Sequence, residues 1–469
     1  MAKDKKTIFL TLSTRAVFRN LFFFPGGVFS KLRERAENKD DLKVVLLVPK
    51  REANKYDNVL GEGRDEWYFV EPVKTVSSRG VLEKFFYFFY SYLIYTGTTK
   101  VLATMSMRPD EPPAGGRRYL ASIKWLIANT FGRIKFVKTK VVPRLFLKIF
   151  RERPFKDVFE KYNPSMVFIS HLYGWTDQHL LAEAKRQKVK TVGMAAGWDH
   201  LDKYFLPFHV DTLLAQSHEI KASAIKYQSY PTESIEIVGY PHFDFITDLK
   251  NILPKEEIMT ALGFPADSRY FVYVSGSAYC PDEPDIVEKI ISWIDEGKFG
   301  ENAHLIVRPY AGGRSNDREF DYEKFNRFAK HPRVYFFDHD LWGDVEKSRL
   351  FVNILRYSSV VIAVYTTIAL EAVALDRPIL APAFDGYKKR SAHRSISRFE
   401  KFEHFQGVLK TGAMKTARNF DDLFIFLNNY LQDSSIDDEE RELMRQKLCY
   451  KLDCLASKRV ADFILKNND

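Results

Sequence analysis

The sequence predicts an α/β protein in which two doubly wound parallel sheets follow one another along the chain. Short apolar segments rich in β-branched and aromatic residues alternate with stretches of about 10–15 residues that have helical periodicity. This alternation runs through the first half of the chain and restarts near residue 270. A chain of 469 residues is also too long for one ordinary core. Alternating strands and helices form βαβ units, so each half is expected to build its own parallel sheet.

The order of these segments gives the expected domain boundaries. We expect an N-terminal domain over residues 1–245, a C-terminal domain over 246–437, and a C-terminal helix over 438–469 that packs back on the N-terminal domain. Open α/β sheets bind ligands at the carboxyl ends of their strands, so the two domains are expected to face a central cleft. The expected strands are 8–13, 43–49, 67–70, 166–170, 191–195, 212–215, 234–238, 270–275, 304–308, 334–337, 360–364 and 379–381.

Composition narrows the class of protein. An apolar share of 45% and a charged share of 28% are typical of a soluble globular chain. A net charge of +10 predicts an anionic partner. The spacing of the three cysteines fits neither a disulfide framework nor a metal-binding pair, which favours a protein located in the reducing cytosol. The start of the chain is expected to form a strand and not a signal peptide, and the longest apolar run, 85–95, is too short to span a membrane.

The segment 358–380 carries the clearest functional signal. It predicts a buried strand, a tight turn at Tyr365, Thr366 and Thr367, a short helix containing Glu371, and a second strand. A strand that ends in hydroxyl residues and opens into a helix presents free N–H groups to a phosphate. Glu371 would then accept hydrogen bonds from a ribose. The alternative is that the hydroxyls only cap the helix and Glu371 is an ordinary first-turn acid.

A second group of polar residues follows the strands of the N-terminal half. His171 comes directly after the strand 166–170, and Asp199 and His200 follow the next one, so these side chains are expected to be neighbours. His171 or Asp199 would act as general base, unless the histidine is only hydrogen-bonded within its own turn. Asp177 is expected to cap the helix that follows.

Two further features stand earlier in the chain. Gly26 and Gly27 would let the backbone approach a phosphate or an acceptor, or simply form a turn. Residues 81–153 are expected to form a helical, basic insertion that lies on an anionic membrane. The alternative is that its apolar positions are core and its lysines form a solvated face. Nucleic acid is not expected as a partner, because no recognition motif accompanies the charge.

The motif 358–372 with Arg377-Pro378-Ile379 resembles the donor-binding motif of glycosyltransferases with the two-Rossmann GT-B architecture. It is nearest to surface-carbohydrate and glycerophosphotransferase-like enzymes. The resemblance is best over residues 165–385 and weak over 50–160. One departure is Tyr310, which stands where histidine is commoner. Further segments that resemble this family are 193–200, 213–215, 235–244, 274–277 and 304–310.

The resemblance implies a set of donor-binding residues. Glu371 would hold the donor ribose, and the turn with Tyr365, Thr366 and Thr367 would bind the donor at its diphosphate. Arg308 and the Gly276–Ser277 loop would offset the phosphate charge. Helix N-termini and a guanidinium can offset a leaving diphosphate, so neither a metal nor another cofactor is expected.

The function that follows from the resemblance is transfer of a sugar or glycerophosphate. The donor would be nucleotide-activated and the acceptor a cell-surface polysaccharide or a lipid-linked glycan, with the enzyme peripheral on the cytoplasmic face of the plasma membrane. The alternatives are a nucleotide-sugar 2-epimerase, which shares the fold, and a non-catalytic nucleotide- or glycan-binding subunit.

Overall fold

The computed structural model of the chain divides into two compact units that interleave along the sequence. Unit 1 contains Met1–Thr96, Ser122–Phe245 and Tyr450–Asp469, and unit 2 contains Gly97–Ala121 and Ile246–Cys449. The expectation of a central cleft concerns the placement of the two units and stays a prediction. The structure describes residues 6–14, 17–18, 21, 26–39, 41–50, 67–74, 80–104, 120–276, 280–310, 322–339, 341 and 344–468.

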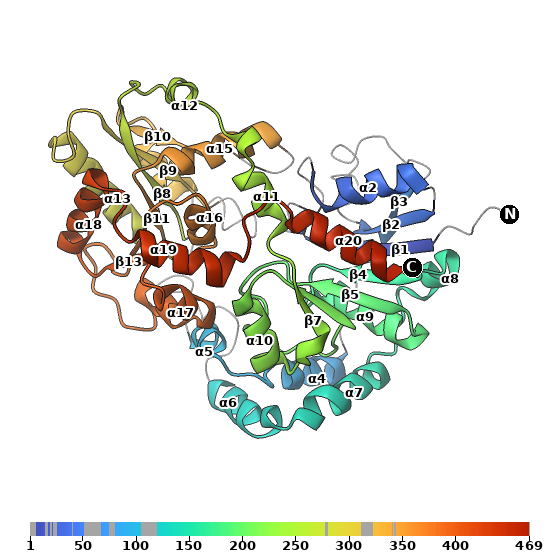
Figure 1. The fold of residues 1–469 in the computed structure, drawn as a ribbon. Coiled ribbons are helices and arrows are strands. Elements are labelled where there is room, and N and C mark those ends of the chain that lie inside the picture. Colours follow the sequence, from blue (N-terminus) through green and yellow to red (C-terminus); the bar gives the residue numbers. More distant parts are fainter. Residues whose placement is uncertain are drawn as a thin grey trace. The chain divides into compact units, whose positions relative to one another are not determined.

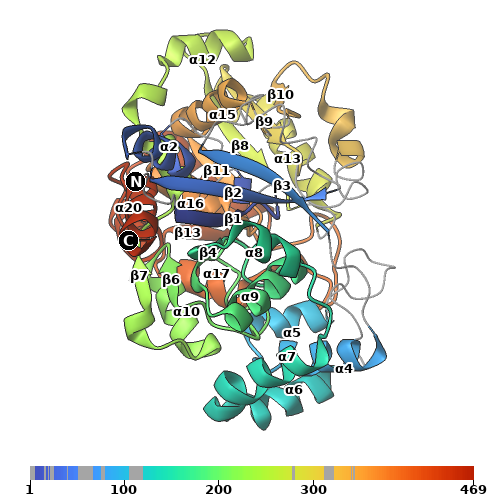
Figure 2. The same cartoon turned by 90° about the vertical axis from the view of Figure 1, so that its right-hand side faces the viewer.

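Unit 1 is built on a seven-stranded sheet in the order β3-β2-β1-β4-β5-β6-β7, and every strand pair is parallel. Figure 2 shows β1, β2 and β3 running side by side. The strands β1, β2, β4, β5 and β6 are mostly buried, as expected where helices cover both faces of a parallel sheet, whereas the edge strands β3 and β7 each contain an acidic residue. Their bounds are β1 (Lys6–Thr11), β2 (Leu42–Pro49), β3 (Tyr68–Val73), β4 (Met166–Ile169), β5 (Lys190–Met194), β6 (Thr212–Ala215) and β7 (Ile235–Ile237).

The helices of unit 1 connect these strands, and the last one comes from the C-terminus of the chain. Helix α20 lies beside α2 in both views of the fold (Figures 1 and 2). Helix α11 begins in unit 1 and ends in unit 2. The bounds are α2 (Val28–Lys39), α4 (Val81–Ser91), α6 (Ala121–Asn129), η3 (Phe131–Arg133), η4 (Val137–Val141), α7 (Val142–Ile149), α8 (Lys156–Tyr162), α9 (Trp175–Gln187), α10 (His218–Gln228), η5 (Thr232–Ser234), α11 (Pro241–Thr247) and α20 (Ala456–Asn468).

Unit 2 is built on a six-stranded parallel sheet in the order β10-β9-β8-β11-β12-β13. The edge strand β13 was not among the sequence expectations. It is only four residues long, and two of these are partly exposed, so its apolar signal is weak. The bounds are β8 (Arg269–Val274), β9 (Ala303–Arg308), β10 (Val334–Phe336), β11 (Val360–Ala363), β12 (Ile379–Pro382) and β13 (Met414–Ala417).

The helices of unit 2 include one, α5, from the N-terminal half of the chain. Thr98 Oγ1 of α5 accepts a hydrogen bond from the Glu403 backbone N–H at 2.9 Å, which docks α5 on α17. The bounds are α5 (Gly97–Thr104), η6 (Leu249–Asn251), α12 (Lys255–Leu262), α13 (Glu283–Asp295), η8 (Asn326–Phe328), α15 (Val345–Tyr357), α16 (Ile368–Ala374), η9 (Ile396–Lys401), α17 (Glu403–Leu409), α18 (Phe420–Gln432), α19 (Asp438–Met444) and η10 (Arg445–Cys449).

The fold class predicted from the sequence, two doubly wound parallel sheets, is confirmed. The C-terminal segment differs from the single helix that its periodicity suggested. It forms α19 and the π-helical turn η10 in unit 2, followed by α20 in unit 1. Among the described residues, no helix is both long and apolar enough to cross a lipid bilayer.

Candidate functional site

Each sheet has one place where the direction of strand addition reverses. In unit 1 this switch point lies between β1 and β4, and in unit 2 it lies between β8 and β11. The loops that leave the carboxyl ends of these two strands diverge to opposite faces of the sheet, which opens a crevice that ligands commonly use. The candidate residues of both units follow strands that lie at or beside these two switch points.

Hydroxyl groups join the two strand ends at the switch point of unit 1. Ser170 Oγ donates a hydrogen bond to the Thr11 carbonyl oxygen at 2.9 Å, and the two side-chain oxygens are 3.2 Å apart. His171 follows Ser170 directly. Gly174 lets the chain fold tightly here, because a Cβ at this position would lie 2.6 Å from His171 Nδ1 and 2.5 Å from an Asp177 carboxylate oxygen.

His171 and Asp177 form a titratable pair in this turn. The His171 Nδ1 atom lies 3.9 Å from Asp177 Oδ2, and the Asp177 side chain is only 1% exposed. Burial raises the pKa of Asp177 to about 7, and the hydroxyls of Ser13 and Thr11 act in the opposite direction. Burial, together with the charge of Lys203, lowers the pKa of His171 to about 4. At pH 7 the imidazole is therefore neutral and able to accept a proton.

The expectation that Asp177 caps the helix was wrong. Helix α9 begins at Trp175 and Gly174 occupies the cap position, so Asp177 lies inside the first turn and is buried. Its carboxylate faces His171, a relation that local spacing did not reveal.

Asp199 and His200 lie beside His171, as the order of strand ends predicted. The ring centroids of His171 and His200 are 5.4 Å apart, and Tyr173 packs against both rings. Asp199 forms an ion pair with Lys203. Burial lowers the pKa of Lys203, but the charge and hydrogen bond of Asp199, together with Tyr173 and Asp202, outweigh burial and raise the pKa. Because Asp199 is held in this ion pair, His171 is the more available proton acceptor of the two.

Gly26 and Gly27 lie at the start of α2. Gly26 has a φ of +81°, which explains the glycine, and the Gly27 carbonyl accepts a hydrogen bond from the Lys31 N–H at 3.1 Å. A Cβ on Gly26 would meet no atom within 4 Å. The role of the two glycines in binding stays a prediction.

The turn after β11 forms the first part of the candidate site in unit 2. Tyr365 has a φ of +47°, and its ring packs against Phe399 and Phe405, so its side chain faces the core. Thr366 Oγ1 is buried and has no hydrogen-bond partner among the described residues. Thr367 is exposed, so the entrance to α16 is open to solvent. Glu371 lies in the first turn of α16 and is 6% exposed.

Arg308 ends the neighbouring strand β9. Its guanidinium lies over the Phe351 ring at 3.9 Å, and its carbonyl accepts a hydrogen bond from the Ser275 N–H at 3.1 Å. Stacking on an aromatic ring holds the planar guanidinium in a fixed position at the end of β9.

Gly276 comes just after β8 and packs against the end of β11. A Cβ at this position would lie 2.7 Å from Cys280 Sγ and 2.9 Å from Val364 Cγ1, so only glycine fits without displacement. The Gly276 N–H donates to Glu283 Oε1 at 2.9 Å, so this amide is engaged within the protein. The expected phosphate contact of Gly276 would thus not use its amide, and Ser277 lies outside the described residues.

A buried ion pair that the sequence did not suggest supports this loop. The Glu283 carboxylate, at the start of α13, accepts hydrogen bonds from Ser275 Oγ at 3.0 Å and from Lys324 Nζ at 2.7 Å. Lys324 also donates to the Cys280 carbonyl at 3.2 Å. Both side chains are nearly inaccessible. This pair fixes both ends of the loop that follows β8.

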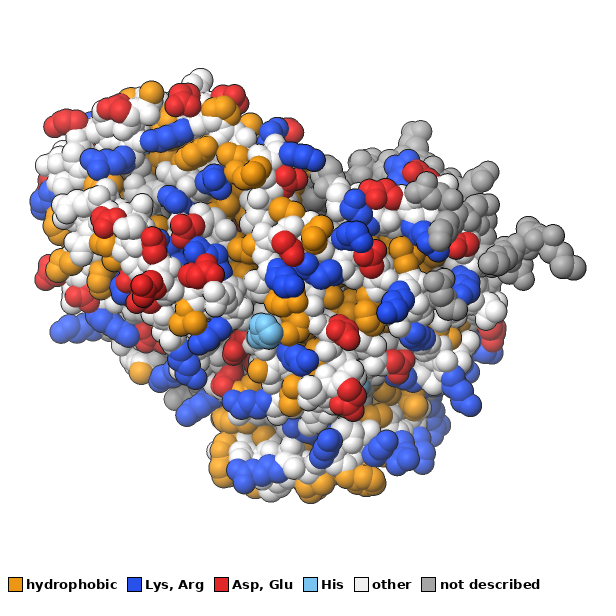
Figure 3. All heavy atoms as spheres, viewed as in Figure 1, with side chains coloured by type: hydrophobic (Ala, Val, Ile, Leu, Met, Phe, Trp, Pro, Cys, Tyr) orange, Lys and Arg blue, Asp and Glu red, His pale blue; other side chains and the backbone are white. Residues whose placement is uncertain are grey.

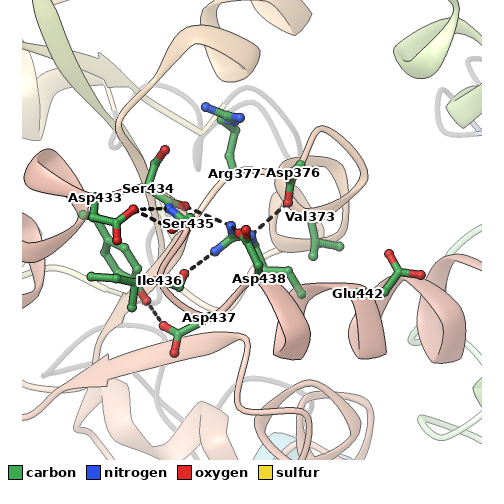
Figure 4. Close-up of polar contacts among 12 residues, drawn as sticks. Val373, Asp376, Arg377, Asp433, Ser434, Ser435, Ile436, Asp437, Asp438 and Glu442 are labelled. Carbon is green, nitrogen blue, oxygen red and sulfur yellow. Dashed lines mark hydrogen bonds and ion pairs between the residues drawn. The ribbon is translucent and has the colours of Figure 1, made fainter.

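An open depression of about 510 Å³ lies at the opposite end of α16 from Thr367. Its lining is mostly acidic, which disfavours phosphate. Asp376 and Asp438 accept hydrogen bonds from Arg441, which also donates to the Ser434 and Ile436 carbonyls (Figure 4). This network fastens α19 to the turn after α16 and is structural.

Among the described residues, no group of three or more His, Cys, Asp or Glu side chains is arranged to hold a metal ion.

Comparison with solved structures identifies the fold. Over 98% of its length the chain matches S. aureus MnaA in complex with UDP, with a TM-score of 0.52, 13% identity and 96% of that chain covered. It also matches the UDP-GlcNAc 2-epimerase of Methanocaldococcus jannaschii over 98% of its length, with a TM-score of 0.50, 12% identity and 99% of that chain covered. No known family profile and no curated protein matches the sequence. The chain has the two-Rossmann, GT-B-like fold.

The buried carboxyl of Asp177 gives a prediction about stability. Folding raises the pKa of Asp177 from about 3.8 to about 7. Below pH 4 this group is protonated in both states and costs no stability, whereas its ionisation lowers the free energy of unfolding progressively as the pH rises through 7. Asp177→Asn removes this loss. The variant is expected to be more stable than wild type at pH 7.5, by on the order of 2–4 kcal/mol, and the difference should shrink toward pH 4. Thermal unfolding at several pH values measures it.

Asp211, also in unit 1, is the control, because folding shifts its pKa in the opposite direction to that of Asp177. Burial raises the pKa of Asp211, but the hydrogen bond and charge of Lys185 and the hydrogen bonds from Thr191 together outweigh burial and lower the pKa. Asp211→Asn should therefore destabilise the protein at pH 7.5. A stability difference for Asp177→Asn that does not change with pH would contradict the assignment.

The Glu283–Lys324 pair gives a second prediction. Glu283→Gln leaves a buried ammonium unpaired and is expected to cost about 3–5 kcal/mol. Adding Lys324→Met should recover much of this loss, because it removes the unpaired charge. Urea unfolding of the single and double variants measures the coupling. The matched control is Glu288→Gln on the same helix, which breaks an exposed ion pair with Arg327 and should cost less than about 1 kcal/mol. Additive losses for Glu283 and Lys324 would contradict the pairing.

Proposed function

We propose that this protein is a GT-B-type transferase. It moves a sugar or glycerophosphate unit from a nucleotide-activated donor to a cell-surface polysaccharide or a lipid-linked acceptor, at the cytoplasmic face of a membrane. The observation that carries the proposal is the set of groups at the switch point of unit 2. Arg308, the Thr366–Thr367 turn and Glu371 all lie at the carboxyl edge of β9 and β11.

The chemistry of these groups suits a nucleotide diphosphate. Arg308 supplies a positive charge, and the buried Thr366 hydroxyl and the exposed Thr367 side chain would supply hydrogen-bond donors. Glu371, in the first turn of α16 and 6% exposed, is assigned in this proposal as the acceptor of hydrogen bonds from the ribose hydroxyls. These groups offset the charge of a departing phosphate without a metal, so we propose that catalysis needs none.

Unit 1 supplies the proton acceptor in this proposal. The acceptor hydroxyl oxygen attacks the transferred unit, the bond from that unit to the nucleotide phosphate breaks, and the nucleotide leaves with the electron pair. The hydroxyl proton passes to His171. A neighbouring Asp177 that ionises near pH 7 stabilises the imidazolium that forms. Asp199 keeps Lys203 in place beside this pair.

Nucleotide binding tests the site in unit 2. A diphosphate such as UDP, CDP or GDP is expected to raise the melting temperature by about 2–4 °C at a hundredfold excess over its Kd. Arg308→Ala should weaken binding by about 10- to 100-fold, because it removes a charge-assisted contact. The matched control, Arg327→Ala, removes an exposed arginine of the same unit and should bind like wild type. If no diphosphate shifts the melting temperature, the proposed donor site is wrong.

Turnover tests the pair in unit 1. With the preferred donor, His171→Ala and Asp177→Asn are expected to lower kcat by about 10²- to 10⁴-fold with little change in nucleotide Kd. Activity should persist in EDTA, because protein groups offset the phosphate charge. Product analysis by NMR separates the alternatives. An epimerised nucleotide sugar formed without acceptor would show an epimerase, and nucleotide binding without turnover would show a non-catalytic subunit.

A further inference from the structure

A group of large apolar side chains lies exposed on one region of unit 1. They come from the first turns of α4, from α6, and from the segment around η3. We call this set the apolar face. Its members are Val81, Leu82, Phe85, Ile123, Trp125, Leu126, Phe131, Ile134 and Phe136.

Helix α6 has the reverse of the usual arrangement of polar and apolar residues. Its lysine, Lys124, is 1% exposed, and its ammonium lies 4.4 Å from the centroid of the Tyr92 ring. Trp125 and Leu126 are 53% and 55% exposed. Burial lowers the pKa of Lys124, so the helix buries a cation at a cost while its apolar side chains face outward. A cluster of exposed apolar side chains of this kind is typical of a surface that binds an apolar partner.

The apolar face rests on a well-packed frame. Phe131 packs edge-on against Phe89 of α4, with ring centroids 5.5 Å apart. Gly132 lies so close to Leu93 that a Cβ would be 2.1 Å from the Leu93 carbonyl oxygen. Lys138 is also buried and donates to the Tyr227 carbonyl at 3.1 Å. These contacts hold the segment around η3 and the start of η4 against the rest of unit 1.

Positive charge surrounds the apolar face. The sequence from residue 120 to residue 151 contains eight lysines and arginines and no acid. Two of the eight, Lys124 and Lys138, are buried. Figure 3 shows hydrophobic side chains along the lower edge of the molecule, with lysine and arginine side chains beside them. The remaining basic residues are all exposed: Arg133, Lys135, Lys140, Arg144, Lys148 and Arg151.

We propose that the apolar face docks on an anionic lipid bilayer. Trp125 and Phe136 enter the boundary between headgroups and acyl chains, and the six exposed basic residues contact the headgroups. The charge pattern favours this partner over a second copy of the chain, because two copies would bring like charges together. A nucleic acid would leave the exposed leucine, isoleucine and phenylalanine side chains in water. This inference does not depend on the proposed donor site.

Flotation of the full chain with vesicles tests the proposal. The protein is expected to float with vesicles of phosphatidylcholine and phosphatidylglycerol, and much less with phosphatidylcholine alone. A double change, Trp125→Ser with Phe136→Ser, should reduce binding at least tenfold. Lys135→Glu should reduce it by about fivefold or more and make it less sensitive to salt. The matched control is Leu249→Ser, an exposed leucine of unit 2 that is 77% accessible, which should float like wild type.

Two further measurements separate other outcomes. Vesicles containing brominated acyl chains should quench the fluorescence of Trp125, and the quenching should be lost in Trp125→Phe while binding remains. Light scattering shows whether the apolar face joins two copies. The proposal is overturned if the protein stays in solution with anionic vesicles, if the double variant floats like wild type, or if that variant instead abolishes a dimer. Nucleotide binding should be unchanged in these variants, so failure here is distinct from failure of the donor site.

Discussion

The parallel connection of strands is the constraint on which the rest of this structure depends. Each crossover returns the chain to the same edge of the sheet, so the carboxyl ends of all strands in a unit lie together. Where the direction of strand addition reverses, neighbouring loops separate and polar residues are tolerated at the ends of buried strands. The candidate residues of unit 1 follow β4 and β5, and those of unit 2 follow β8, β9 and β11.

Buried carboxyl groups have opposite effects at the loop ends of the two units. In unit 2, Glu283 is paired with Lys324 and accepts a hydrogen bond from Ser275, so the ionised carboxylate stabilises the loop after β8. In unit 1, Asp177 is buried next to a neutral histidine, and its pKa rises to about 7. A buried carboxyl without a cationic partner destabilises the ionised fold and is therefore typical of a site where protons move. The first group is a support, and the second is a candidate for chemistry.

The region between α4 and α7 shows how a helical pattern can be interpreted in the wrong direction. The alternation of basic and apolar residues suggested either a membrane face or an ordinary core with a solvated basic face. The structure buries Lys124 and Lys138 and exposes Ile123, Leu126 and Phe131. These three apolar residues are therefore not core, although Phe86 and Phe146 of the same region are, and the two lysines are not part of the solvated face. A hydrophobic pattern gives the period of a helix but not which side faces the protein, because that depends on elements distant in sequence such as Tyr92.

The sequence by itself determined the fold class, most of the strands, and the approach of His171, Asp199 and His200. These follow from local periodicity and from the rule that parallel strands end on one edge. Only the tertiary structure decided the pairing of Asp177 with His171, the support of Gly276 by Glu283 and Lys324, and the inward direction of Tyr365. It also assigned α5 to unit 2 and divided the C-terminal segment between the units. Each of these depends on contacts between residues brought together by folding, which composition and spacing do not encode.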